Sequence, residues 1–90
     1  MLKIVTVCGN GIGSSLMLKM KIEEICEEEG ITVDVESCDF AAAQGKEADF
    51  IITVKEFATH FVNKDVLIVR SYMNKNKIRE DVLPGLRKKS

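Results

Sequence analysis

The 90-residue chain is predicted to form a single α/β domain, residues 1–90, with a parallel sheet covered by helices on both faces. Short runs rich in β-branched residues alternate along the chain with segments of helical periodicity. Two of these runs, residues 2–7 and 48–54, are almost continuously apolar, which is typical of strands buried on both faces. Strands and helices in alternation build right-handed βαβ units, and therefore a three-layer αβα arrangement.

The first predicted strand, residues 2–7, ends at Cys8 and is followed by Gly-Asn-Gly-Ile-Gly-Ser-Ser at residues 9–15. Glycine at every second position lets the backbone adopt positive φ repeatedly, so successive N–H groups can turn inward around an anion. The helix that follows adds unpaired N–H groups and the positive end of its dipole at the same point. We therefore predict a phosphate-binding loop after the first strand, formed by Gly9, Asn10, Gly11, Ile12, Gly13, Ser14 and Ser15.

Cys8 is the predicted catalytic nucleophile, because a thiolate at the start of such a loop is stabilised near neutral pH. The alternative for any single cysteine is a buried thiol with a packing role. Cys26 falls in a helical core stripe and is assigned to packing, whereas Cys38 follows the second strand. The odd number of cysteines, without a C-x-x-C pair and with one histidine, argues against a disulfide scaffold and against a metal site.

The first helix is predicted from residue 15 to about residue 29, with Ser14 or Ser15 as its N-cap and Gly30 as its stop signal. The acidic residues 27–29 at its end are interpreted as a solvated face. The apolar residues of one face follow helical spacing: Leu18, Ile22, Ile25 and Cys26.

Three further apolar residues, Leu16, Met17 and Met20, project from roughly the opposite side of this helix, next to the loop. An error in the helical phase would place them in the core. The functional interpretation is an exposed and adaptable patch beside Cys8 on which a partner protein docks.

The remaining elements follow from apolar runs and turn residues. Strands are predicted at residues 31–37, 48–54 and 65–70, a loop with one weak helical turn at 38–46, a short helix at 55–62, and a helix from 74 to about 83. Asn74 caps the last helix, Ile78 and Val82 lie on its buried face, and the Pro-Gly pair at 84–85 is expected to end or kink it.

Composition excludes several classes of function. The formal net charge is −1 and the few aromatic residues are not interleaved with arginines, so no nucleic acid partner is expected. No apolar stretch approaches the roughly 20 residues that span a bilayer, and no signal peptide is visible, so we expect a cytoplasmic protein.

The chain resembles the B subunit (enzyme IIB) of the bacterial phosphoenolpyruvate-dependent sugar phosphotransferase system. The resemblance lies in the first strand, the segment from Cys8 to Ser15 and the helix that follows, together with Met-Leu-Lys-Met-Lys at 17–21. The ascorbate type is most similar, and the galactitol, mannitol and lactose types are more distant. The resemblance implies a four-stranded parallel sheet of order 2-1-3-4. It also implies that Cys8 accepts a phosphoryl group from a histidine of the A component (EIIA). A sugar or sugar acid held by the membrane permease (EIIC) would then receive it, without a cofactor, and the chain would associate peripherally with that permease.

Other glycine-loop proteins fit less well. Low-molecular-weight protein tyrosine phosphatases use Cys-x5-Arg-Ser, but Ser14 stands where their arginine would be, and no Asp-Pro pair supplies a general acid. A phosphatase-like hydrolase is therefore the less favoured enzyme. A non-catalytic anion-binding regulatory module remains the other alternative. The G-x-G-x-G spacing and the missing Gly-Lys-Ser/Thr argue against dinucleotide and Walker loops.

Two positively charged positions and the single histidine complete the candidates. Lys55 and Arg70 lie at the ends of predicted strands on the expected active rim, where they either add positive potential or remain solvated charges. His60 is assigned a structural or surface role, since the resemblance places the phosphorylated histidine on the A component.

Overall fold

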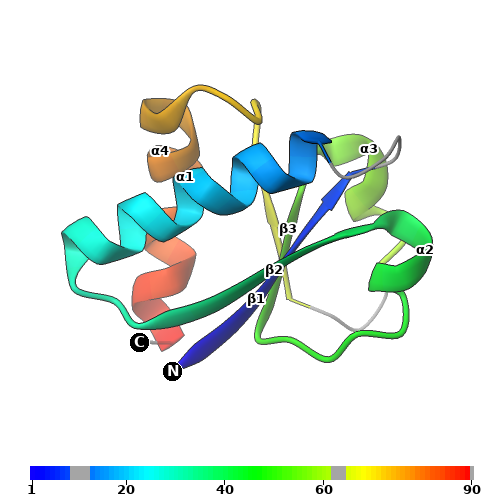
Figure 1. Cartoon of the computed structure of the whole chain (residues 1–90), viewed down its shortest axis with the longest axis horizontal. Coiled ribbons are helices and arrows are strands. Elements are labelled where there is room, and N and C mark those ends of the chain that lie inside the picture. Colours follow the sequence, from blue (N-terminus) through cyan, green and yellow to red (C-terminus); the bar gives the residue numbers. More distant parts are fainter. Residues whose placement is uncertain (9–12, 62–64, 90) are drawn as a thin grey trace.

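Four parallel strands form one sheet in the order β2-β1-β3-β4 in the computed structural model of the chain (Figure 1). The structure describes residues 1–8, 13–61 and 65–89, and for residues 8, 13–15 and 89 it describes the backbone only. The elements are β1 (Leu2–Cys8), α1 (Gly13–Glu29), β2 (Val33–Asp39), α2 (Phe40–Ala43), β3 (Phe50–Thr53), α3 (Lys55–Ala58), β4 (Val66–Ile68) and α4 (Lys75–Lys89). The predicted fold class and the strand order implied by the resemblance are confirmed.

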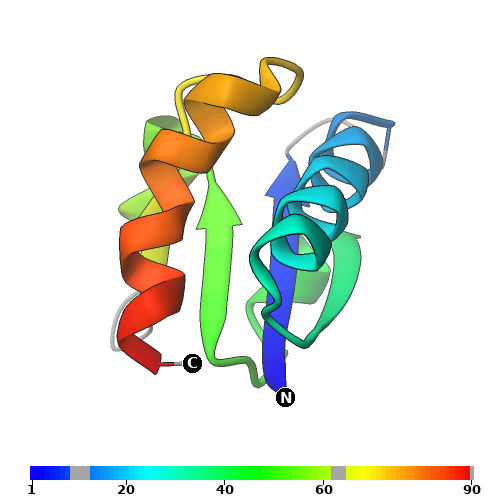
Figure 2. The ribbon, with the colours of Figure 1, turned by 90° about the vertical axis from the view of Figure 1, so that its left-hand side faces the viewer.

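Helices cover both faces of the sheet, and each face has its own apolar core. On one face α1 and α4 pack over β1 and β3 through residues such as Ile4, Ile22 and Ile52 (Figure 2). On the other face Val5 and Val7 of β1 pack with Ala43 of α2, and Phe57 of α3 packs against the same cluster. Successive residues of β1 thus point to opposite cores, which explains the continuous apolar run of this strand.

The long helix α1 buries the predicted stripe: Leu18, Ile22, Ile25 and Cys26 have no exposed surface. Gly30 ends it with φ 74°, a conformation that L-residues with a side chain rarely adopt. The Gly30 N–H donates to the Glu27 carbonyl at 3.3 Å and the Ile31 N–H to the Cys26 carbonyl at 2.8 Å, which is the hydrogen-bond pattern of a Schellman cap.

The start of α1 differs from the prediction. The helix begins at Gly13, so Ser14 and Ser15 lie inside its first turn and neither is the N-cap. The backbone N–H groups of the first turn of a helix have no acceptor within that helix.

The end of the last helix also differs, because α4 continues through Pro84 to Lys89. Proline removes one intrahelical hydrogen bond, but residues beyond it are held by tertiary contacts. Leu86 is fully buried in the α1–α4 core, and an ideal Cβ on Gly85 would lie 2.5 Å from Leu67 Cδ2. The close approach of α4 to β4 at Gly85, together with the burial of Leu86, keeps the chain helical past the proline.

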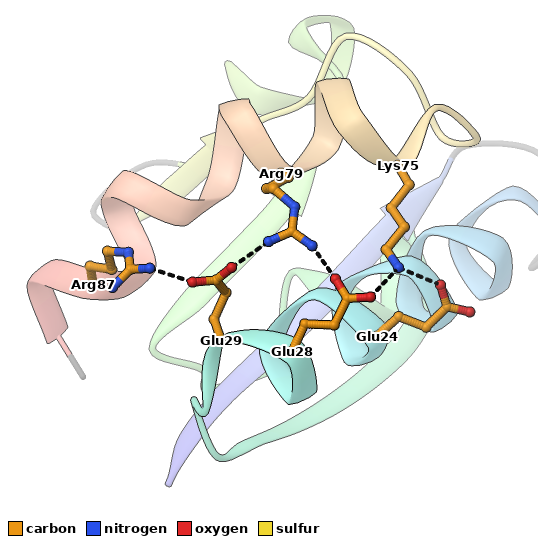
Figure 3. Close-up of polar contacts among 6 residues, drawn as sticks. All are labelled: Glu24, Glu28, Glu29, Lys75, Arg79 and Arg87. Atoms are coloured by element: carbon orange, nitrogen blue, oxygen red, sulfur yellow. Dashed lines mark hydrogen bonds and ion pairs between the residues drawn. The ribbon is translucent and has the colours of Figure 1, made fainter.

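Two further expectations about polar segments were wrong. Residues 38 and 39 belong to β2 rather than to a loop, and the helical turn predicted in that segment is α2. The acidic end of α1 is not simply solvated, because Glu28 and Glu29 form ion pairs with Lys75, Arg79 and Arg87 of α4 (Figure 3). The partners lie on a helix far away in the sequence, so local periodicity could not indicate them.

Candidate functional site

The candidate site lies at the carboxyl edge of the sheet, where β1 ends at Cys8. The chain passes from β1 to β2 on one side and then crosses to β3 on the other, so the strand order reverses between β1 and β3. Ligands of open parallel sheets bind outside the carboxyl ends of the strands at such a reversal. Cys8 ends a strand at this position, and its backbone pairs in register with Asp39, the last residue of β2.

Residues 9–12 connect Cys8 to the start of α1. Gly9, Asn10, Gly11 and Ile12 lie outside the described residues, as do the side chains of Cys8, Ser14 and Ser15. The backbone on both sides of the segment is described. The segment thus runs from the carboxyl end of the central strand β1 to the amino end of α1, a helix of 17 residues.

The amino end of α1 favours a negatively charged ligand. Its first turn contains no acidic residue, so no carboxylate of the helix competes for the positive end of the dipole. The N–H groups of Gly13, Ser14 and Ser15 belong to this turn, whose N–H groups have no acceptor within the helix. Gly13 is helical, so its predicted role depends on its N–H group in the first turn of α1 and not on a left-handed conformation.

Two residues that sequence reasoning missed contact the backbone immediately before Cys8. The Thr53 hydroxyl donates to the Val7 carbonyl at 3.2 Å, and the Tyr72 hydroxyl donates to the same carbonyl at 3.2 Å. Thr53 ends β3, and Tyr72 lies in the segment between β4 and α4. Their positions after apolar strand runs were the only available signal, because the contacts span 46 and 65 residues of sequence.

Of the two positively charged rim residues, Arg70 is engaged with other protein groups. Arg70 donates from its backbone N–H and from Nε to Asp81, at 3.0–3.2 Å, and from Nη2 to Glu80 at 3.1 Å. The hydrogen bonds that it donates to Asp81, and then to Glu80, raise the pKa of its guanidinium. Arg70 therefore holds α4 near the end of β4. Lys55 is exposed at the start of α3, and its contribution to the potential of the rim stays a prediction.

His60 is exposed, and its ring contacts Phe40 edge-on with a centroid separation of 5.0 Å. This contact agrees with the surface role expected for it.

An exposed apolar patch on α1 adjoins the site. The exposed fractions of Leu16, Met17 and Met20 are 42%, 36% and 49%, so these side chains are not part of the core. Leu18 and Ile22 of the same helix are fully buried and point to the sheet. We call Leu16, Met17 and Met20 the α1 patch.

The two described cysteine side chains, Cys26 and Cys38, are both buried thiols outside any disulfide bond. Burial raises the pKa of the Cys26 thiol from 9.0 to about 11, so it remains protonated and unreactive near neutral pH. Cys38 packs with Val7 in the core beneath α2. Within residues 1–7, 16–61 and 65–88, no cluster of His, Cys, Asp and Glu is arranged to hold a metal ion.

Comparison with known proteins identifies the family. The family model described as the lactose/cellobiose-specific IIB subunit of the PTS system matches residues 3–82. The chain belongs to this family. It is therefore a phosphoryl-transfer component of a sugar phosphotransferase system, and IIB domains of this system work with A and C components.

Similar curated IIB proteins are named ascorbate-specific PTS system EIIB components. One from Mycoplasma pneumoniae is 33% identical over 84 residues, which is 88% of this chain and 88% of that protein. Another from Escherichia coli O157:H7 is 34% identical over 77 residues, which is 80% of this chain and 76% of that protein.

A solved structure, the lactose-specific IIB component domain of Streptococcus pneumoniae, shares the fold. Its TM-score is 0.63 at 18% identity, and the alignment covers 96% of this chain and 95% of that one.

Among the described residues, no helix has the length and apolar character needed to cross a bilayer.

Proposed function

We propose that Cys8 is the residue of this IIB subunit that accepts and donates the phosphoryl group. The observation that carries the proposal is its place: Cys8 ends β1 at the reversal of strand order, and α1 begins at Gly13. Membership of a phosphotransferase family supplies the chemistry, and the other two cysteines are buried in the cores.

The proposed reaction has two in-line displacements. The Cys8 thiolate attacks the phosphorus of a phosphohistidine on the A component (EIIA), an S–P bond forms, and the N–P bond breaks with its electron pair returning to the imidazole. A hydroxyl of the substrate, bound by the permease (EIIC), then attacks the phosphorus and gives up its proton, and the thiolate leaves. The chain thus acts as a protein-phosphocysteine–sugar phosphotransferase.

Residues 9–15 are proposed to hold the phosphoryl oxygens through backbone N–H groups and the hydroxyls of Ser14 and Ser15. Donors fixed before the reaction stabilise charge that develops in the transition state without having to reorganise. The first turn of α1, without a carboxylate, supports this role. The proposed chemistry requires neither a metal nor an organic cofactor on this chain.

The α1 patch is proposed as the docking surface for the partner proteins. Exposed Leu16, Met17 and Met20 lie in the first turns of the helix that follows the loop, so a protein bound to them would face Cys8. Methionine side chains adapt to different partners, as a carrier that meets both an A component and a permease requires. Docking to the permease would place this cytoplasmic subunit at the membrane.

The proposed substrate is ascorbate or a sugar. The names of the similar IIB proteins from Mycoplasma pneumoniae and Escherichia coli support ascorbate, whereas the family description supports lactose or cellobiose. Transfer assays with permease-containing membranes and each compound in turn would distinguish them.

The decisive experiment is phosphorylation by a phosphoenolpyruvate-driven cascade with the A component, followed by mass spectrometry of the cysteine peptides. We expect one phosphoryl group on Cys8, no label on Cys8→Ser, and normal labelling of the matched control Cys38→Ser. Persistent labelling of Cys8→Ser would overturn the assignment. Rapid release of phosphate by the wild-type chain without any acceptor would favour a hydrolase instead.

A further inference from the structure

The carbonyl group of Val7 marks the point at which β1 leaves its ladder with β3. The β1–β2 pairing continues to Cys8, but the paired residues of β1 and β3 are Ile4–Thr6 and Phe50–Ile52. Val7 lies one residue beyond the last β1–β3 pair. There its carbonyl accepts hydrogen bonds from two side-chain hydroxyls, those of Thr53 and Tyr72.

The two donors come from different elements and converge on one atom. Thr53 is fully buried at the end of β3, and Tyr72 is half-buried, with its side chain packed against the α1–α4 core. The segment that carries Tyr72 is held on both sides. The Ser71 hydroxyl oxygen accepts from the N–H groups of Met73 and Asn74 at 3.1 Å, and the Arg70 N–H donates to Asp81. These hydrogen bonds thus fix the segment that directs the Tyr72 hydroxyl at the Val7 carbonyl.

We propose that Tyr72, together with Thr53, is a positioning residue for Cys8 in phosphoryl transfer. The inference rests on the proposed role of Cys8 and assigns a function to a contact outside the loop.

Peptide geometry links the contact to the nucleophile. The Val7 carbonyl, the Cys8 N–H and the Cys8 Cα lie in one rigid plane, so two donors on the carbonyl oxygen set the orientation of that plane. The plane in turn sets where the Cys8 side chain starts and where the following loop begins. Errors of about 1 Å in the position of a reacting group can reduce rates about 100-fold, so fixing this peptide has a kinetic consequence.

The first test compares Tyr72→Phe with the wild type, using the phosphorylated A component as donor. Phenylalanine keeps the ring in the core and removes only the hydroxyl. We expect the transfer rate at saturating donor to fall about tenfold, equivalent to about 1.4 kcal/mol, the size of one lost hydrogen bond. The donor concentration at half saturation should stay unchanged, because Tyr72 is not part of the α1 patch.

Thr53 provides an independent second pair of variants. Thr53→Val removes the hydroxyl with little change of shape, and Thr53→Ser keeps it. We expect Thr53→Val to slow transfer as Tyr72→Phe does, and Thr53→Ser to restore most of the rate. A role in filling space alone would not depend on the hydroxyl in this way.

A stability-matched control separates positioning from general loosening of the fold. Arg79→Met removes ion pairs to the carboxyl end of α1, about 25 Å along the helix from the end that follows Cys8. Its transfer rate should equal that of the wild type. An unimpaired Tyr72→Phe variant, or an equal loss in Arg79→Met, would overturn the positioning role. A wild-type chain that takes no label on Cys8 would instead overturn the proposed function.

Discussion

Lys75, the first residue of α4, donates from Nζ to Glu28 Oε2 at 2.7 Å and so joins the start of α4 to the last turn of α1. Further along α4, Arg79 pairs with both Glu28 and Glu29, and Arg87 pairs with Glu29 (Figure 3). Negative side chains at a helix carboxyl end are unfavourable alone, and the cations of α4 offset this. The network stabilises the pairing of the two long helices at the end of α1 remote from Cys8.

Arg79→Met is therefore expected to lower stability without affecting the site. Exposed ion pairs contribute about 0.2–1 kcal/mol each. Because Arg79 bridges two carboxylates and its side chain is only 28% exposed, we expect a loss of about 1 kcal/mol, or about 4–8 °C in Tm for a domain of this size. Urea denaturation measures the loss in free energy of unfolding, and Lys77→Met, at an exposed position of the same helix, is the control. Equal stability of the two variants would show that the network contributes nothing.

Met20→Glu tests the α1 patch. Met20 is 49% exposed, so a charge there leaves the core intact, while it should disfavour an apolar partner surface. A central contact of an interface is typically worth more than 1 kcal/mol, so we expect the half-saturating concentration of phosphorylated A component to rise about tenfold with an unchanged maximal rate.

The matched control for Met20→Glu is Ile68→Glu, which charges an apolar side chain of similar exposure, 47%, on β4. Transfer kinetics of this control should match the wild type. Equal weakening by both variants would argue against a docking role for the α1 patch. A large fall in Tm of Met20→Glu would show that Met20 contributes to folding rather than to docking.

The parts of the structure that follow from short-range pattern were predictable from the sequence. Residues 2–7 form a strand because both cores need apolar side chains from it, and Leu18, Ile22, Ile25 and Cys26 repeat at helical spacing. Gly30 ends α1 because the cap requires a positive φ. The strand order required the family resemblance, since periodicity does not specify which strands are neighbours.

The features that depend on distant residues were not predictable. A proline ends or kinks most helices, yet α4 continues beyond Pro84 because Leu86 is buried against α1 and the sheet. The hydroxyls of Thr53 and Tyr72 acquire a role only when the fold brings them to Val7. The predicted residues Gly9, Asn10, Gly11 and Ile12 and the side chain of Cys8 lie outside the described part of the chain, so their roles stay predictions.

The ion pair between Glu28 and Lys75 also predicts a dependence of stability on pH. The hydrogen bond from Lys75, assisted by its charge and that of Arg79, holds the pKa of Glu28 below its ordinary value of 4.5. The folded chain therefore binds this proton less readily than the unfolded chain does. The stabilisation is complete above the ordinary pKa and is lost as the pH falls through the lower, folded value.

Comparison of the wild type with Glu28→Gln isolates this contribution. At pH 7 the wild type should be the more stable, because its carboxylate is charged and paired. The difference in urea midpoint should shrink as the pH falls from above 4.5 through the lower pKa of the folded chain, below which the carboxyl group is protonated in both states. In a Lys75→Met background the Glu28→Gln substitution should have a smaller effect at pH 7, since the hydrogen bond that chiefly lowers the pKa of Glu28 is gone. A difference that stays constant as the pH falls from 7 until the folded chain has taken up its carboxyl protons would mean that the charge of Glu28 does not stabilise the contact between α1 and α4.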